Sequence, residues 1–132
     1  MALTPVSGGQ SKTLLRLAGV DKEFGYSIDA ARGMLVVGTY AGAVRLIPTG
    51  RDGTPSVLGR HKGHQRILVV SFNGDGTKVV SGGEDGQAYI WDLRNRTSIR
   101  LPHPRENTVF GGSFSPDGMT VATAAQDGRV RL

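Results

Sequence analysis

The chain has 132 residues, of which 38% are hydrophobic, so it is long and apolar enough to bury the core of one domain. It holds 20 glycines without a triplet period, which is typical of many tight turns, and no cysteine, which excludes disulfides, thiolate catalysis and Cys-ligated zinc. The net charge of +5 is spread over single basic residues, which favours a solvated basic surface over a concentrated nucleic-acid patch.

No apolar run approaches the roughly 20 residues that a membrane-spanning helix needs. The first residues lack a basic segment followed by an apolar core, so no signal peptide is expected. We therefore expect a cytoplasmic protein without a membrane partner.

The first predicted element is a strand over residues 12–17, and three copies of one pattern follow it. Each copy predicts an alternating first strand, a polar turn, a β-branched second strand, a hairpin turn that ends on glycine, and a third strand. In the first copy these strands are expected at 24–28, 36–38 and 44–47, in the second at 68–72, 79–81 and 88–91, and in the third at 110–114, 121–123 and 130–132. The first two copies add a fourth strand, at 56–58 and 98–101.

The repeat can be seen directly in the amino-acid sequence. Three dipeptides recur at an offset of 42 residues between the second and third copies: Ser71-Phe72 with Ser113-Phe114, Asp75-Gly76 with Asp117-Gly118, and Asp85-Gly86 with Asp127-Gly128. Between the first and second copies the offset is 44, from Ser27-Ile28 to Ser71-Phe72 and from Ala41-Gly42 to Asp85-Gly86. A period of this length predicts an array of similar units.

These motifs resemble WD-repeat β-propellers over residues 13–132, most specifically in Gly63-His64, Asp85-Gly86 and Trp91-Asp92. The resemblance implies an all-β fold of propeller blades, each of four antiparallel strands, with three blades per chain. The blades are expected at about 22–60, 64–102 and 106–132, and the last is expected to be completed by the strand at about 12–18. The chain is then a half-propeller or a fragment of a larger ring.

Two assemblies are compatible with three blades per chain. Three blades are too few to close a ring, and propellers have about four to eight. The N-terminal strand could complete the last blade of a second copy, which predicts a homodimer that forms a six-bladed ring. The alternative is a piece of a longer propeller.

The resemblance also implies a hydrogen-bond network that stabilises the second blade, formed by His64, Ser81, Asp85 and Trp91. The aspartate can accept from the histidine ring, the histidine can bond the serine hydroxyl, and that hydroxyl can accept from the indole N–H. The first copy has apolar or small residues at these positions, and the third has Glu106, Thr123 and Asp127, with His103 three residues out of register.

Catalytic and metal sites are weakly supported. A catalytic His/Ser/Asp triad is the rival interpretation of the network. The resemblance to WD-repeat propellers implies instead that these side chains lie inside the blade, without an oxyanion hole. His61 and His64 lack a third ligand for a metal, and residues 73–76 lack the distal ligands of a calcium loop. No phosphate-binding glycine loop or nucleophile elbow is present. We expect no enzyme activity, no cofactor and no metal.

The resemblance places partner contacts on the top face of the propeller, at three positions per copy. These are Lys22, Phe24 and Tyr40; Arg66, Leu68 and Glu84; and Thr108, Phe110 and Gln126. Aromatic residues and arginine are favoured at interface hot spots. The sequence thus predicts a non-catalytic scaffold or sensor module that binds a protein or peptide, and the alternative is a nucleic-acid or phosphate-bearing partner on the basic surface.

Overall fold

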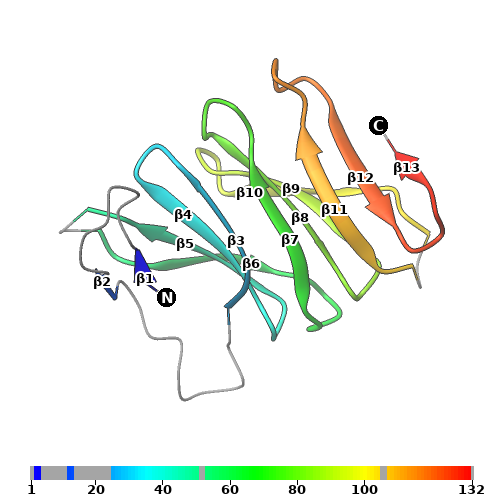
Figure 1. Cartoon of the computed structure of the whole chain (residues 1–132), viewed down its shortest axis with the longest axis horizontal. Coiled ribbons are helices and arrows are strands. Elements are labelled where there is room, and N and C mark those ends of the chain that lie inside the picture. The colour runs from blue at the N-terminus through cyan, green and yellow to red at the C-terminus, as the bar shows by residue number, and fades with distance from the viewer. Residues whose placement is uncertain (1, 4–11, 14–24, 51–52, 105–106, 132) are drawn as a thin grey trace.

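The computed structural model describes residues 2–3, 12–13, 25–50, 53–104 and 107–131. All regular elements of this described part are strands, and three antiparallel sheets lie side by side along the chain (Figure 1). The prediction of an all-β fold built from three propeller blades is confirmed. No helix in the described ranges is long and apolar enough to cross a membrane.

Blade 1 contains β3 (Gly25–Ala31), β4 (Met34–Thr39), β5 (Ala43–Pro48) and β6 (Ser56–Arg60), which pair in chain order. Leu35, Val36 and Val37 are consecutive and all buried, which a strand shows when both faces of its sheet are covered. The strand order places this β-branched run, in β4, between β3 and β5 of its own sheet.

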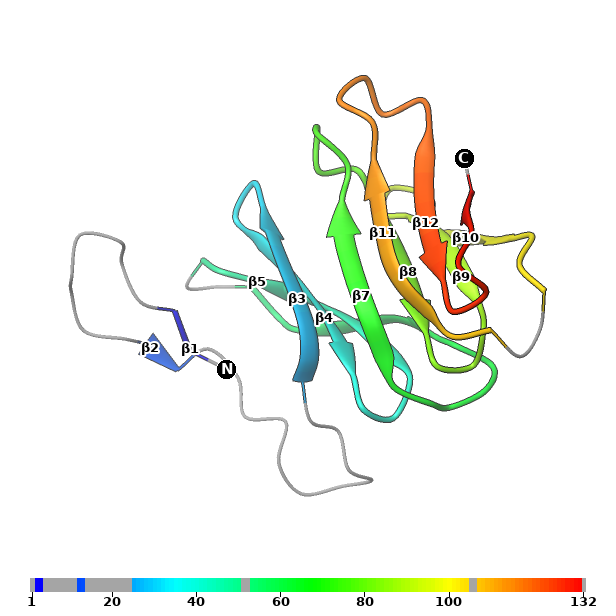
Figure 2. The ribbon, with the colours of Figure 1, turned by 45° about the vertical axis from the view of Figure 1, so that its right-hand side comes forward.

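Blade 2 contains β7 (Ile67–Phe72), β8 (Lys78–Gly83), β9 (Ala88–Asp92) and β10 (Thr97–Leu101), again in chain order. Blade 3 contains β11 (Val109–Phe114), β12 (Val121–Ala125) and β13 (Val130–Arg131) among the described residues. The first strands β3, β7 and β11 stand next to one another in both views (Figures 1 and 2). Equivalent ends of the three blades therefore lie at the same side of the molecule.

The predicted hairpin turns are confirmed at Gly42, Gly86 and Gly128, which have φ angles of 84°, 71° and 74°. Glycine takes this left-handed conformation without a steric cost, so these positions connect the second strand of each blade tightly to the third.

The blades pack through glycines in their second strands. A Cβ added to Gly38 would lie 2.5 Å from the Ile67 side chain of the next blade, and one added to Gly82 would lie 2.5 Å from that of Val109. Both Ile67 and Val109 are 0% exposed. The absence of a side chain at these glycines therefore lets the first strand of one blade approach the second strand of the preceding blade.

The predicted N-terminal strand is described only at its first two residues, Lys12 and Thr13. Lys12–Thr13 (β2) pairs with Ala2–Leu3 (β1) as a separate two-stranded sheet, whereas residues 14–24 lie outside the described residues. Exchange of residues 12–18 into the last blade of a second copy stays a prediction.

The register predicted for the first strand of copy one is wrong by two residues. In the sheets, Ala30 pairs with Leu35 and Phe72 pairs with Val79, so Ala30 rather than Ile28 is the counterpart of Phe72. The offset between blades 1 and 2 is 42 residues in the first strand and 44 only from the second strand onward. The cause is the turn: β3 and β4 are joined by Arg32 and Gly33 alone, both with positive φ, whereas the turn in blade 2 is longer.

Candidate functional site

Every first strand carries a β-bulge near its beginning. The pairing register shifts between Gly25 and Ser27, between Ile67 and Val69, and between Val109 and Gly111. The three residues inside these shifts are Tyr26, Leu68 and Phe110. A bulge leaves one residue without a cross-strand partner and re-aims its side chain, so each blade presents one bulge residue at the same end of the molecule.

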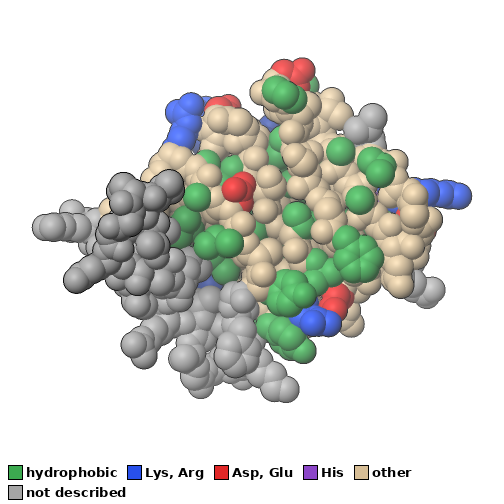
Figure 3. Space-filling view, viewed as in Figure 1, with side chains coloured by type: hydrophobic (Ala, Val, Ile, Leu, Met, Phe, Trp, Pro, Cys, Tyr) green, Lys and Arg blue, Asp and Glu red, His purple; other side chains and the backbone are tan. Residues whose placement is uncertain are grey.

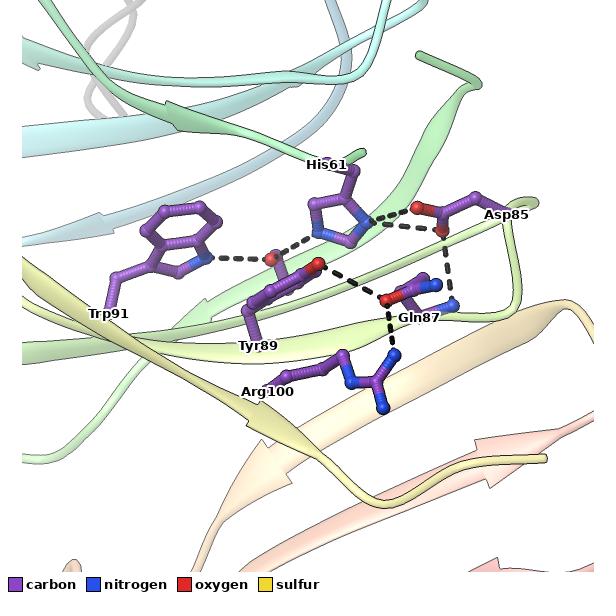
Figure 4. A network of polar contacts seen from close by, with 7 residues as sticks. His61, Asp85, Gln87, Tyr89, Trp91 and Arg100 are labelled. Carbon is purple, nitrogen blue, oxygen red and sulfur yellow. Dashed lines mark hydrogen bonds and ion pairs between the residues drawn. The ribbon is translucent and has the colours of Figure 1, made fainter. Parts of the chain in front are cut away.

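The blade-2 network is present, and its histidine is His61. Nδ1 of His61 lies 3.1 Å from Asp85 Oδ1, and Nε2 lies 2.8 Å from Ser81 Oγ. Trp91 Nε1 donates to the same hydroxyl at 2.8 Å (Figure 4). Because the indole can only donate, the hydroxyl hydrogen is left for His61 Nε2, and Nδ1–H then donates to the carboxylate.

The surroundings of the network keep its groups in place. The ring of Tyr89 meets the His61 ring edge-on at 4.7 Å between centroids. The Tyr89 hydroxyl donates to Gln87 Oε1 at 3.1 Å, and Asp85 Oδ1 also accepts from the Gln87 backbone N–H at 3.1 Å (Figure 4). Burial and a nearby carboxylate both raise the pKa of Tyr89, so its hydroxyl stays a donor.

The prediction that His64 belongs to this network is wrong. His64 is exposed, has a φ of 50° and lines a surface hollow, whereas His61 is 0% exposed. His61 follows β6 of blade 1 and bonds Ser81 and Asp85 of blade 2, so the network also links two blades. Gly63-His64 matched the sequence motif of the repeat, but His61, three residues earlier, is the histidine that contacts the buried Ser81 hydroxyl.

The same correction applies to blade 3. His103 precedes Thr123 by the same 20 residues that separate His61 from Ser81, so it is in register, and Glu106 lies outside the described residues. His103 Nε2 lies 2.6 Å from Thr123 Oγ1. Blade 3 differs in the role of its carboxylate, because Asp127 is ion-paired with Arg131. His103 Nδ1 is buried without a hydrogen-bond partner in the described part of the chain.

The network geometry argues against a catalytic triad. Ser81 and His61 are both 0% exposed, and the Ser81 hydroxyl already accepts from the indole of Trp91. A nucleophile must reach its substrate, and this hydroxyl is covered on all sides by the blade. No group of three or more His, Asp or Glu side chains in the described ranges could hold a metal ion.

A second cluster lies at the end of the blades where the first strands begin. The Arg66 guanidinium carbon lies 5.2 Å from the ring centroid of Tyr40 and 5.6 Å from that of Tyr26. Arg66 Nη2 also donates to Glu84 Oε1, and this hydrogen bond to the carboxylate raises the pKa of the guanidinium above its ordinary value. The arginine is thus held as a charged plane against two tyrosines.

An open hollow of about 390 Å³ adjoins this arginine. It is lined by Tyr40, His64, Gln65, Arg66, Glu84 and Thr108. Tyrosine, histidine, glutamine, arginine and threonine can all donate hydrogen bonds, and glutamate can only accept. The hollow therefore offers several donors and one carboxylate.

Around this hollow, large apolar side chains are exposed. Tyr26 is 54% exposed, Tyr40 is 44% and Phe110 is 57%. Figure 3 shows hydrophobic side chains gathered about a basic and an acidic side chain near the beginnings of β7 and β11. We name as the Arg66 face the set Tyr26, Tyr40, Arg66, Glu84, Thr108 and Phe110.

The structure places the sequence-predicted contact residues as follows. Tyr40, Arg66, Glu84 and Thr108 line one hollow, and Phe110 is exposed at the bulge of the next blade. The other described members are Leu68, which is half-buried, and Gln126, which is exposed. Lys22 and Phe24 lie outside the described residues.

Sequence reasoning missed Tyr26, which takes the bulge position that the wrong register gave to Phe24. It also missed Gln65 and the place of His64 in the hollow. The two-residue turn at Arg32-Gly33 was the signal that could have identified Tyr26. Because this turn is shorter than that of blade 2, every residue of β3 matches a residue of β7 two positions earlier than the other strands predict.

Two stretches of the chain, residues 55–92 and 97–132, match the family described as "WD domain, G-beta repeat". The first stretch runs from β6 to β9 and the second from β10 into the end of blade 3. Each sequence repeat thus combines the outer strand of one blade with the first three strands of the next, and His61 lies inside the first repeat.

Several characterised proteins are similar to this chain. The Periodic tryptophan protein 2 homolog of Schizosaccharomyces pombe is 35% identical over 78 residues, which cover 58% of this chain and 9% of the relative. The human DDB1- and CUL4-associated factor 5 is 36% identical over 70 residues, 52% of this chain and 7% of the relative. The human WD repeat and HMG-box DNA-binding protein 1 is 30% identical over 111 residues, 83% of this chain and 10% of the relative. The chain therefore spans about a tenth or less of the length of these relatives.

Proposed function

Because the chain belongs to the family of WD domains with G-beta repeats, we propose that it is a non-catalytic interaction module that binds a protein or peptide partner at the Arg66 face. Related proteins of this family often serve as interaction partners or scaffolds. A fold of this kind does not define a function by itself, so the proposal depends on the side chains of the face.

The observation that carries the proposal is the position of Arg66 against two exposed tyrosines. Arginine and tyrosine are enriched among residues that dominate binding energy, and both lose little freedom on binding when they are already held in place. Glu84 and the rings of Tyr26 and Tyr40 hold this arginine before any partner arrives. The face is therefore pre-organised for contact.

The second support is the grouping of exposed apolar area. Single exposed apolar side chains are ordinary on a protein surface, but a cluster beside polar residues is typical of interaction sites. Tyr26, Tyr40 and Phe110 come from blade 1 and blade 3, and Arg66 of blade 2 lies between these blades in chain order. Three blades thus contribute to one face.

A photo-crosslinking experiment tests this proposal. The substitution Phe110→p-benzoylphenylalanine places a reactive group on the Arg66 face, and Met119→p-benzoylphenylalanine places it at the other end of the same hairpin. Met119 is the matched control because it is also an exposed large apolar residue, at 84%. We expect a discrete protein adduct from position 110 in cells and none from position 119. Equal labelling from both positions, or labelling from 119 alone, would contradict the proposal.

A nucleic-acid partner is the second candidate, supported by the net charge of +5. Contacts to phosphates release counterions, so this candidate predicts an affinity that falls steeply as salt rises. The steepness of this fall between about 50 and 200 mM salt distinguishes the two candidates, because a peptide held by one guanidinium depends on far fewer charge contacts than a nucleic acid that binds through several phosphates.

A six-bladed ring of two copies is a separate prediction about assembly. Light scattering on a sizing column would show a mass near twice 14.0 kDa for the ring. Deletion of residues 1–17 should then abolish the dimer, and a dimer that survives the deletion would contradict strand exchange.

A further inference from the structure

We propose that the hollow beside Arg66 binds a carboxylate side chain, so that the partner contributes an acidic peptide segment. This inference rests on the proposed function and names the chemical group of the partner that the Arg66 face would bind. Its basis is the state of the Arg66 guanidinium before binding.

Part of this guanidinium is already engaged within the chain. The rings of Tyr26 and Tyr40 lie within cation–π distance, and Nη2 donates to Glu84. That bond is the one hydrogen bond from the Arg66 side chain among the described residues. A guanidinium has five N–H groups, so donors remain for a second acceptor.

These remaining donors have access to solvent. The Arg66 side chain is 36% exposed, and the residue lines the open hollow. Arginine binds carboxylates through two parallel N–H···O bonds, and such charge-assisted bonds are about twice as strong as neutral ones. Gln65 and Thr108 line the same hollow and can donate to the peptide that carries the carboxylate.

A cationic ligand fits this site less well than an acidic one. Two tyrosines and a glutamate would suit an ammonium or guanidinium group, but Arg66 already occupies that position from within the chain. A ligand cation would have to displace a tethered arginine or lie beside it, and like charges at close range repel. The one carboxylate of the hollow, Glu84, is already paired with Arg66 and so opposes an acidic ligand less than a free carboxylate would. The net charge of +5 also attracts acidic partners over longer distances.

The size of the hollow agrees with a peptide side chain. Its volume of about 390 Å³ is at the lower end of the range for small-molecule pockets, enough for one or two residues of a peptide. The exposed ring of Phe110 on the next blade offers an apolar contact for a neighbouring residue of the same segment. The preferred ligand is therefore an acidic residue close to an apolar one.

The test is a nuclear magnetic resonance titration of the full chain with defined peptides. The probe is acetyl-Gly-Leu-Glu-Glu-Leu-Gly-amide, and its neutral counterpart has glutamine in place of both glutamates. Blocked ends exclude binding through a terminal carboxylate. We expect the acidic peptide to shift the Arg66 Nε–Hε and Thr108 amide signals, with an affinity about tenfold above that of the glutamine peptide.

Matched variants assign the effect to the guanidinium. Arg66→Lys keeps the charge but loses the planar pair of donors, so we expect about tenfold weaker binding of the acidic peptide. Arg94→Lys is the control, because Arg94 is exposed in the turn after β9 at the opposite end of the same blade. Its binding should match that of the unaltered chain.

Several outcomes would overturn the inference. Equal binding of the acidic and glutamine peptides, or no effect of Arg66→Lys, would show that the hollow does not read a carboxylate. Much tighter binding of a phosphoserine peptide, or of an oligothymidine at these signals, would assign the site to phosphate instead. If Phe110→p-benzoylphenylalanine crosslinks a partner but the acidic and glutamine peptides bind equally, the proposed function survives and this inference fails. Without a crosslink, the proposed function itself fails.

Discussion

His103 Nε2 lies 2.6 Å from Thr123 Oγ1, which repeats the 2.8 Å contact of His61 Nε2 with Ser81 Oγ one blade earlier. Blades 2 and 3 therefore share a pair of a histidine and a hydroxyl, which is buried in blade 2 and partly buried in blade 3. They differ at Nδ1 of the imidazole. In blade 2 this nitrogen meets a carboxylate, and in blade 3 the equivalent carboxylate, Asp127, is paired with an arginine.

The two histidines of the His-Lys-Gly-His segment should differ sharply in their effect on stability. His61→Asn removes a ring that bonds Ser81 and Asp85, and it leaves buried polar groups with poor partners. We expect a loss of about 2–3 kcal/mol in the free energy of unfolding, measured by urea denaturation. His64→Asn is the control, because asparagine tolerates the positive φ of this exposed position, and it should change stability by less than about 0.5 kcal/mol. Equal effects would contradict the assignment of His61.

The indole N–H should contribute to stability mainly through the serine hydroxyl. Trp91→Phe removes the donor to Ser81 Oγ, and we expect a loss of about 1–2 kcal/mol from the unmet acceptor, besides the lost packing. In a Ser81→Ala background the same change should cost about 1 kcal/mol less. A double-mutant cycle by urea denaturation measures this coupling. A coupling near zero would show that the bond adds nothing to stability.

Much of this architecture could be predicted from sequence. Strand identities follow from β-branched runs between glycine turns, and the turn glycines follow from the Asp-Gly pairs of the second and third copies and the matching Ala41-Gly42 of the first. These features are local, and each copy repeats them. Gly42, Gly86 and Gly128 therefore lie where the pattern placed them.

The errors came from features that a motif match does not measure, namely distances in space and the length of one turn. The choice between His61 and His64 depends on which ring reaches a hydroxyl 20 residues later, and a motif match cannot measure this reach. The placement of Tyr26 depends on turn length, since the two-residue turn of blade 1 shifts the first strand while the second strand keeps its register. Pairing of Arg66 with two tyrosines also arises only when adjacent blades pack.

Packing between blades should be sensitive to a single added methyl group. In Gly82→Ala the new Cβ would lie 2.5 Å from Val109 Cγ1 and 3.0 Å from Val109 Cβ, so the blades must separate or distort. We expect the free energy of unfolding, measured by thermal or urea denaturation, to fall by about 1–3 kcal/mol. Gly111→Ala is the matched control, because its nearest neighbour would be Ala124 Cβ at an ordinary 3.5 Å. A second change, Val109→Ala, should partly restore the stability of Gly82→Ala, and no restoration would place the strain elsewhere.

Arg131 should control the ionisation of blade 3. Its hydrogen bond lowers the pKa of Asp127 from 3.8 to about 2, and its charge adds to the burial that lowers the pKa of His103. Arg131→Gln should therefore raise the pKa values of both Asp127 and His103, which carbon-detected magnetic resonance titrations of the two side chains can follow. Unchanged values for both residues would contradict the pairing.

The same ion pair gives a pH dependence with a defined sign. The folded pKa of Asp127 lies below its unfolded value, so the pair stabilises the protein fully above about pH 4, and this contribution is lost as pH falls from about 4 to about 2. The unaltered chain should thus lose part of its advantage over Arg131→Gln across this interval. Urea denaturation of both proteins between pH 2 and pH 6 measures the difference. An advantage that stays constant down to pH 2 would mean that the carboxylate of Asp127 does not contribute to stability through Arg131.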